Sequence, residues 1–186
     1  WAESFPANSV ACNNHDGAFS AVDYLIGLQH KKIGFVADEN FFLSSEKERY
    51  KGYCSAMRFD SLEINDAMLF KEPVMNYDKI ADSIKRKDIT ALFAVNDRCG
   101  LKLINELLDK GIHIPEDVSI IGFDDYETSR LTRVPLTTVR QHFEEEGHYA
   151  AQILLDIVAG SPIQFNKILI GTELVVRSST AVLNIK

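Results

Sequence analysis

Polar side chains that could bind a small ligand are grouped at five places in the chain, and each group directly follows an apolar segment. In a sheet of parallel strands, the carboxyl ends of the strands meet at one edge, where open α/β folds bind their ligands. We therefore expect the five groups to converge on one rim and to line a crevice. They occupy residues 13–16, 38–45, 96–97, 124–125 and 140–142.

The residue types in these groups suit a neutral ligand that carries several hydroxyl groups. Ser45 and Arg49 are four residues apart at the start of a predicted helix, so they share one face of it. The planar guanidinium of Arg49 can donate to two neighbouring hydroxyls or to a carboxylate, and Asp124 can accept from two hydroxyls. Asn96 and Gln141 each carry a donor and an acceptor. The sequence contains no glycine-rich phosphate-binding loop, which disfavours a phosphate ligand.

Several of these residues also have a purely structural interpretation. Asn96 and Asp97 stand where a helix cap would lie, and Asp125 and Asp117 are of a type common in turns and caps. Arg49, considered alone, is also compatible with a solvated position on a helix. The five histidines show no metal-ligand spacing, so we expect no metal site.

Apolar periodicity predicts strands and helices in alternation along almost the whole chain. Continuous apolar runs predict buried strands, and apolar residues at i, i+3, i+4 and i+7 predict amphipathic helices. A capping box at Ser45 and Glu48 predicts the start of the second helix, and Gly111 the end of the fourth. The alternation predicts an α/β architecture with parallel strands and right-handed crossovers. Strands are expected at 8–12, 33–37, 68–70, 89–95, 118–123 and 135–139, with one or two more at 167–176, and helices at 18–28, 45–57, 78–87, 98–110 and 143–159.

Composition limits the classes of protein to which the chain can belong. Its 186 residues are 46% hydrophobic and 25% charged, which is typical of a soluble globular protein. The 20 Lys and Arg residues against 27 Asp and Glu give a net charge of −7, which repels the phosphate backbone of DNA. Three widely separated cysteines indicate buried thiols in a reducing compartment. Neither a signal peptide nor a membrane-spanning run is recognisable, so we expect a cytoplasmic location.

Six motifs in order resemble the effector-binding domain of the LacI/GalR family of transcriptional regulators. The resemblance covers nearly all of the chain, and six ordered motifs are far more specific than any one of them. Two departures from the family pattern, Gly100 for the usual alanine and Gln29 for the usual glycine, lie outside the expected ligand contacts. The motifs are SVACNNHDG at 9–17, Glu-Arg-x-x-Gly-Tyr at 48–53, Asn-Asp at 96–97, IPEDVSIIGFDD at 114–125, PLTTVRQ at 135–141 and RSST at 177–180.

This resemblance implies a fold similar to that of type I periplasmic binding proteins, with two parallel-sheet lobes, three crossovers and the ligand between the lobes. It assigns residues 1–30 and 142–170 to the N-terminal lobe and residues 31–141 and 171–186 to the C-terminal lobe. The first repeats of the N-terminal lobe and the DNA-binding headpiece are expected to be missing from the chain. The residues implied to contact the ligand are Asp16, Ser45, Arg49, Tyr77, Asn96, Asp124, Gln141 and Phe143.

The function implied by the resemblance is the sensing of a small polar effector, with a sugar favoured, by a bacterial repressor. Effector binding would favour one arrangement of the lobes, and a homodimer would transmit the difference to DNA through the headpiece. A purine or another small polar effector is also compatible with these side chains. No cofactor and no membrane partner is expected.

Two other classes of protein stay open at this point. A periplasmic sugar-transport receptor would have the same fold with a leader peptide and no headpiece, although the motifs at 135–141 and 177–180 favour the regulator. A hydrolase would use Asp124 and Asp125 as paired carboxylates. Adjacent residues of an extended chain point to opposite sides, which disfavours a joint catalytic role, so we expect no enzymatic activity.

Overall fold

A six-stranded sheet is the main feature of the computed structural model, which describes residues 8–38, 43–71, 75–160 and 167–184. The strand order is β3-β2-β4-β5-β6-β8, and neighbours are parallel except for β6 and β8. A second, two-stranded sheet pairs β1 with β7 in parallel. The strands are β1 (Ser9–Cys12), β2 (Ile33–Ala37), β3 (Leu69–Lys71), β4 (Ala91–Ala94), β5 (Ser119–Asp124), β6 (Thr137–Gln141), β7 (Lys167–Ile170) and β8 (Thr172–Val175).

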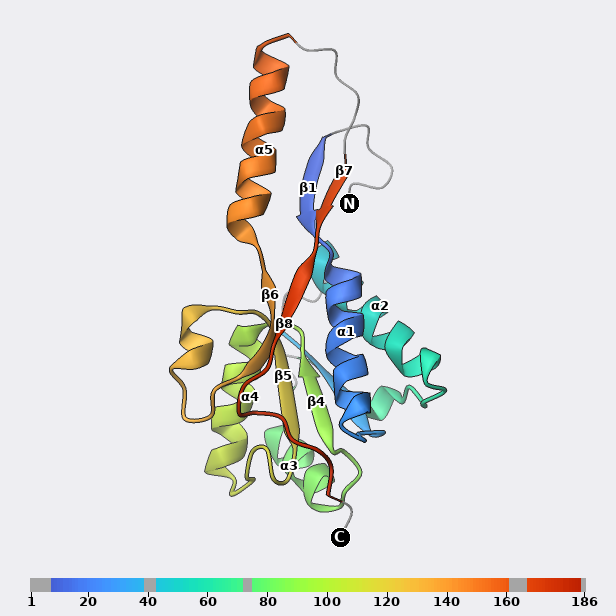
Figure 1. Cartoon of the computed structure of the whole chain (residues 1–186). Helices are drawn as coiled ribbons and strands as arrows, with labels where there is room; N and C mark the ends of the chain where they lie inside the picture. The colour runs from blue at the N-terminus through green and yellow to red at the C-terminus, as the bar shows by residue number, and fades with distance from the viewer. Residues whose placement is uncertain (1–7, 39–42, 72–74, 161–166, 185–186) are drawn as a thin grey trace.

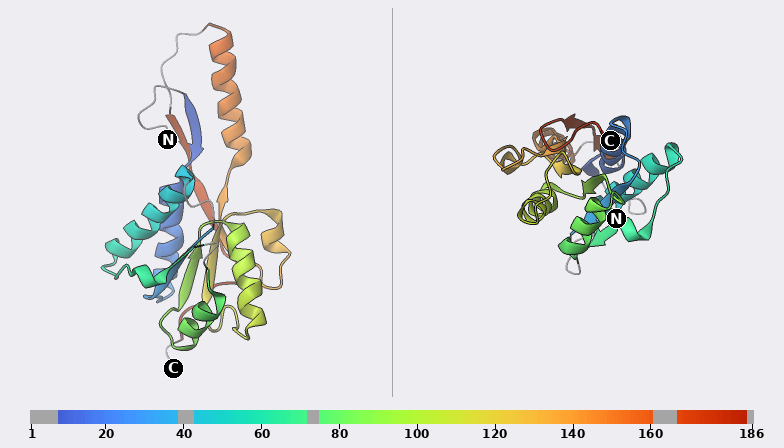
Figure 2. Two further views of the ribbon diagram at one scale, coloured as in Figure 1. Left: turned by 180° about the vertical axis from the view of Figure 1, so that it is seen from behind. Right: turned by 90° about the horizontal axis from the view of Figure 1, so that it is seen from below.

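Helices cover both faces of the six-stranded sheet, with α1 and α2 on one side and α3 and α4 on the other (Figures 1 and 2). The fifth helix, α5, stands beside the two-stranded sheet. This is the predicted α/β architecture, and β8 is the exception to parallel pairing among the described strands. The helices are α1 (Asn14–Gly27), α2 (Ser44–Phe59), α3 (Tyr77–Lys85), α4 (Asp97–Asp109) and α5 (Phe143–Val158), with short 3-10 turns η1 (Asp66–Met68) and η2 (Glu127–Arg130).

The chain passes between the two sheets three times, as the resemblance implies. It leaves the small sheet between β1 and α1, returns to it between β6 and α5, and leaves it again between β7 and β8. In Figure 1, α5, β1 and β7 stand together above the six-stranded sheet. The predicted periplasmic-binding-protein-like arrangement of two sheets and three crossovers is therefore confirmed.

The core lies where the helices pack on the central strands of the larger sheet. Every residue of β2, β4 and β5 is buried, as expected of parallel strands covered on both faces. Gly111, with φ +75°, follows the end of α4 as predicted. The capping box predicted at Ser45 is wrong, because α2 begins at Ser44 after Leu43 and has no side-chain cap bond.

Helix α1, which the resemblance assigns to the N-terminal lobe, lies against the larger sheet. It packs along α2 and also contacts β4, β5, β6 and β8 of the larger sheet. The two helices approach closely at Gly52 of α2, where a Cβ atom would overlap the carbonyl oxygen of His15 and lie 2.9 Å from the Cβ atom of Ala18. Of the described elements that the sequence assigns to residues 1–30, only β1 therefore belongs to the smaller sheet.

Substitution of Gly52 by alanine should lower the free energy of unfolding by about 2 kcal/mol or more, because the new methyl group forces α1 and α2 apart. Urea denaturation measures the change. The control is Gly147→Ala in α5, where a Cβ atom would meet nothing within 4 Å. Alanine in a helix should stabilise that variant by about 0.5–1 kcal/mol. A Gly52→Ala variant as stable as the wild type would contradict the close packing of α1 on α2.

Helix α5 presents apolar side chains to solvent. None of its residues is buried, and Leu154, Leu155 and Val158 are 60%, 62% and 77% exposed. It packs against β1 of the small sheet. Apolar side chains grouped in this way on a helix are typical of a face that another surface covers. Within the described ranges, no helix has the length and apolar character needed to cross a bilayer.

Candidate ligand site

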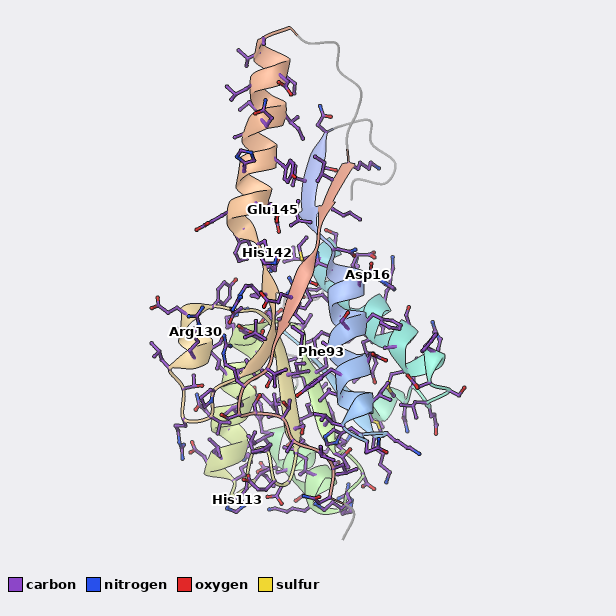
Figure 3. All side chains as sticks on the ribbon, in the orientation of Figure 1. Asp16, Phe93, His113, Arg130, His142 and Glu145 are labelled. Atoms are coloured by element: carbon purple, nitrogen blue, oxygen red, sulfur yellow. The ribbon has the colours of Figure 1, made fainter. Side chains whose placement is uncertain are left out.

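The polar groups predicted from the sequence meet at the carboxyl edge of the six-stranded sheet, except that residues 39–42 of the second group lie outside the described residues. Figure 3 shows which edge this is. His142, which follows β6, lies at the end of the sheet nearest α5, and His113, which precedes β5, lies at the opposite end. The polar groups at the ends of β2, β4, β5 and β6 therefore face the junction with the small sheet.

Arg49 of α2 is the centre of this site, and its side chain is only 7% exposed. Its Nε atom donates to Oδ1 of Asn14 at 2.8 Å, and its Nη1 atom donates to the carbonyl oxygen of Val95 at 2.8 Å. Its Nη2 atom lies 3.1 Å from Oδ1 of Asp124. The guanidinium carbon also lies 3.9 Å from the centre of the Phe123 ring. One buried cation thus connects the start of α1 with the ends of β4 and β5.

Asp124 is the acceptor at the centre of the site. Besides its ion pair with Arg49, its Oδ1 atom accepts a hydrogen bond, 2.6 Å long, from Nε2 of Gln141. Burial raises the pKa of Asp124 to about 6, although Arg49 and Gln141 both act to lower it. The backbone φ is +124° at Asp124 and +57° at Asp125. Such angles cost about 1–3 kcal/mol in a residue other than glycine, so the polar contacts hold Asp124 against backbone strain.

A second polar group surrounds Asn96. Asn96 caps α4, because its Oδ1 atom accepts from the backbone N–H of Cys99 at 2.8 Å. Its Nδ2 atom donates to Oδ2 of Asp38 at 2.9 Å and lies 3.4 Å from Oε1 of Glu46. Arg98 pairs with the same oxygen of Asp38 at 2.8 Å. Asn96 can therefore be both a helix cap and a site residue. Its side-chain oxygen accepts from the backbone of α4, and its side-chain nitrogen donates to the two carboxyl groups.

The other predicted contacts lie around this centre. Ser45 is half-buried in the first turn of α2, and Phe143 begins α5 with 51% of its surface exposed. Asp16 lies in the first turn of α1 (Figure 3), where its exposed carboxylate bonds to neighbours in the same turn. The ring of Tyr77 in α3 faces Nζ of Lys102 in α4 at 5.8 Å. Asp16 and Tyr77 thus contact residues other than Arg49.

Sequence reasoning missed Asn14 and Glu46 and misread Asp97. Asn14 belongs to the polar group at 13–16, so its position in the sequence could have identified it as a site residue. Nothing in the sequence distinguished Glu46, because glutamate in a first helical turn is usually solvated. Asp97 is fully buried and does not cap α4. It accepts hydrogen bonds from Oγ of Ser129 at 2.5 Å, from the hydroxyl of Thr138 and from the backbone N–H of Tyr126 at 3.1 Å.

Asp125 has partners entirely different from those of Asp124. Its carboxylate is paired with Arg177 and Arg140, the latter at 2.7 Å, and its side chain is 1% exposed. Burial acts to raise its pKa, but hydrogen bonds from these two arginines lower the pKa below its usual range. The two aspartates thus do not form a catalytic carboxylate pair. In the part of the chain that the structure describes, no group of three His, Cys, Asp or Glu side chains could hold a metal ion.

Comparison with known protein families agrees with this geometry. The model of the periplasmic binding protein-like domain matches residues 22–180. The chain belongs to this family. The HTH-type transcriptional repressor PurR of Haemophilus influenzae strain PittEE is 35% identical to it over 182 residues, which are 93% of this chain and 54% of the relative. The chain therefore spans about half the length of the curated relatives that it matches.

Solved structures connect this member of the family with LacI-type regulators. A LacI family transcriptional regulator from Enterococcus faecium with bound ribose has 25% identity and a TM-score of 0.83, with 98% of this chain and 68% of that one covered. The transcriptional regulator CelR in complex with cellobiose has 27% identity and a TM-score of 0.82, with 94% and 54% covered. The predicted resemblance to LacI-family effector-binding domains is confirmed. These relatives are named as regulators and not as enzymes, in agreement with the expectation.

Proposed function

We propose that this chain is the effector-binding part of a LacI-type transcriptional repressor, with its ligand bound between the carboxyl edge of the six-stranded sheet and the smaller sheet. The observation that carries the proposal is the buried ion pair of Arg49 and Asp124 at that edge, to which Gln141 donates a hydrogen bond. A few convergent polar groups in an otherwise apolar setting are typical of small-molecule sites. Ser45, Asn96 and Phe143 border the same edge and stay in the proposed site, whereas Asp16 and Tyr77 would have to exchange their present contacts to reach a ligand there.

We favour a sugar as the ligand class, because similar regulators bind sugars. Two regulators similar to this chain carry ribose and cellobiose in their structures. Arg49 can donate to two neighbouring hydroxyls, and Asp124 can accept from two. Nucleobases present comparable donors and acceptors, so they belong in any test panel.

Ligand binding would act by selecting one arrangement of the two sheets. We propose a smaller unit of β1, α5 and β7 and a larger unit that includes α1, which moves the expected boundary from residue 30 to residue 13. Of the described residues, 142–160 and 167–170 stay in the smaller unit, and 31–38, 43–71, 75–141 and 171–184 stay in the larger one. A coupling of about 1–3 kcal/mol between ligand and DNA binding, in a cytoplasmic homodimer with a DNA-binding headpiece, would be enough to change operator occupancy.

Gln141→Ala should weaken ligand binding by roughly tenfold or more, because it removes a donor that orients Asp124. A thermal-shift panel of sugars and nucleobases first identifies a ligand, and calorimetry then measures its affinity for the variant. The control is Gln152→Ala, which removes an exposed glutamine of α5 that bonds to Asp156. Equal affinities of wild type and Gln141→Ala would contradict the proposed site.

A further inference from the structure

Two buried carboxyl groups lie next to the Arg49 site on the side of Asn96. Asp38 is 6% exposed and Glu46 is 4% exposed. Both face the amide nitrogen of Asn96, at 2.9 Å for Asp38 and 3.4 Å for Glu46. Burial, together with the neighbouring charge and hydrogen bonding of Asp38, raises the pKa of Glu46 to about 7. An additional donor at Glu46 would favour its ionised form.

Glu46 has an oxygen atom that no group satisfies. Among the described residues, its Oε2 atom is one of two buried side-chain polar atoms without a hydrogen-bond partner, the other being Oε1 of Glu146 on α5. A buried acceptor without a hydrogen bond destabilises the folded state, so its presence indicates a functional role. Glu46 lies three residues before Arg49 on α2, so the two side chains share the helix face that looks onto the carboxyl edge.

The donors already present are directed at Asp38 rather than at the free oxygen of Glu46. Arg98 and Asn96 both donate to Oδ2 of Asp38. Arg49, the other nearby cation, is occupied by Asn14, Val95 and Asp124. No group of the described residues donates to this buried oxygen, so a donor carried by a bound ligand would satisfy it.

We propose that Asp38 and Glu46 form a subsite for an amino group of the ligand, so that the effector is an amino-substituted sugar or nucleobase and not a plain polyol. This inference rests on the proposed function, since it places the subsite beside the proposed ligand site at Arg49. A hydroxyl group can donate only one hydrogen bond, whereas an amino group carries at least two N–H donors and can reach both carboxyl groups. Hydrogen bonds from a nitrogen donor to a carboxylate are also among the strongest in proteins.

Matched ligand pairs test the proposal by calorimetry on the purified protein. The pairs are D-glucosamine with D-glucose, D-galactosamine with D-galactose, and adenine with unsubstituted purine. The wild type should bind the amino-bearing member of at least one pair roughly tenfold more tightly than its partner, and the pair that responds distinguishes a sugar from a nucleobase. Glu46→Gln should reduce this preference to about twofold or less.

Two further variants keep the test decisive. Asp38→Asn should reduce the same preference, so a failure of Glu46→Gln to fold would not remove the test. Glu145→Gln changes an exposed glutamate of α5 (Figure 3) and should leave the preference intact. Circular dichroism checks that each variant is folded.

Three results would overturn the subsite: a wild type that shows no preference for any amino-bearing member, a wild type that binds none of them, or a preference that persists in Glu46→Gln and Asp38→Asn. The proposed function fails separately. If amino-free ligands bind and Gln141→Ala weakens them, the site at Arg49 stands while the amino subsite is wrong. If ligands bind with an affinity that does not depend on Gln141 or Arg49, the proposed function itself is wrong.

Discussion

Replacing Arg49 by alanine should abolish ligand binding and lower the free energy of unfolding by about 3–5 kcal/mol. The substitution leaves the carboxylate of Asp124, which is 6% exposed, without its cation. It also leaves Oδ1 of Asn14 and the carbonyl oxygen of Val95 without the N–H groups that now donate to them. Titration calorimetry measures the loss of binding, and urea denaturation measures the loss of stability.

The loss of stability should depend on pH through Asp124. Its pKa in the folded chain is about 6, above the ordinary value of 3.8, and Arg49 acts to lower it. Without Arg49 the folded-state pKa rises further. A carboxyl group with a raised folded-state pKa contributes stability that is fully present below its unfolded pKa and is lost as the pH rises through the folded value. The deficit of Arg49→Ala relative to wild type should therefore be larger at about pH 8 than at about pH 5.

Two variants separate the binding effect from the folding effect. Arg58→Ala removes an exposed arginine from the last turn of the same helix and should change neither affinity nor stability. Adding Asp124→Asn to Arg49→Ala should recover part of the lost stability, because the buried charge is gone, without restoring binding. Unchanged affinity of Arg49→Ala for the ligand of the wild type would contradict its place in the site.

Asp97→Ala should lower the free energy of unfolding by about 3 kcal/mol or more without any direct effect on a ligand. Asp97 is fully buried, and its loss leaves the hydroxyls of Ser129 and Thr138 and the N–H group of Tyr126 without their acceptor. Ser129 lies in η2, Thr138 lies in β6, and Tyr126 lies in the segment between β5 and η2. One carboxylate therefore connects α4 with the region that leads into the crossover at Gln141.

The matched control for Asp97 is Asp109→Ala at the other end of α4. The Asp109 side chain is 74% exposed and pairs with an exposed arginine, Arg133. Its removal should change the free energy of unfolding by no more than about 0.5 kcal/mol. Equal losses in the two variants, measured by urea denaturation, would show that Asp97 does not hold these segments together.

Most of the fold could be predicted from the sequence because its signals are local. The apolar run at 33–37 became β2, which is buried along its whole length, and Gly111 follows the end of α4 with the positive φ that glycine favours. The antiparallel pairing of β8 with β6 has no such local signal, because the direction of a strand depends on where its connection leads. The place of α1 against α2 also depends on a long-range contact, the close approach at Gly52.

Residue types and their spacing were enough to predict that suitable polar side chains follow the strands, with Arg49, Asp124 and Gln141 among them. How these side chains pair depends on the folded chain. Asp97, Asp124 and Asp125 are the same type of residue, yet their partners differ. Asp97 accepts hydrogen bonds from uncharged donors, Asp124 pairs with Arg49, and Asp125 pairs with Arg140 and Arg177. Hydrogen bonding and burial depend on groups that are distant in the chain, so residue type and spacing could not distinguish these three roles or reveal the free oxygen of Glu46.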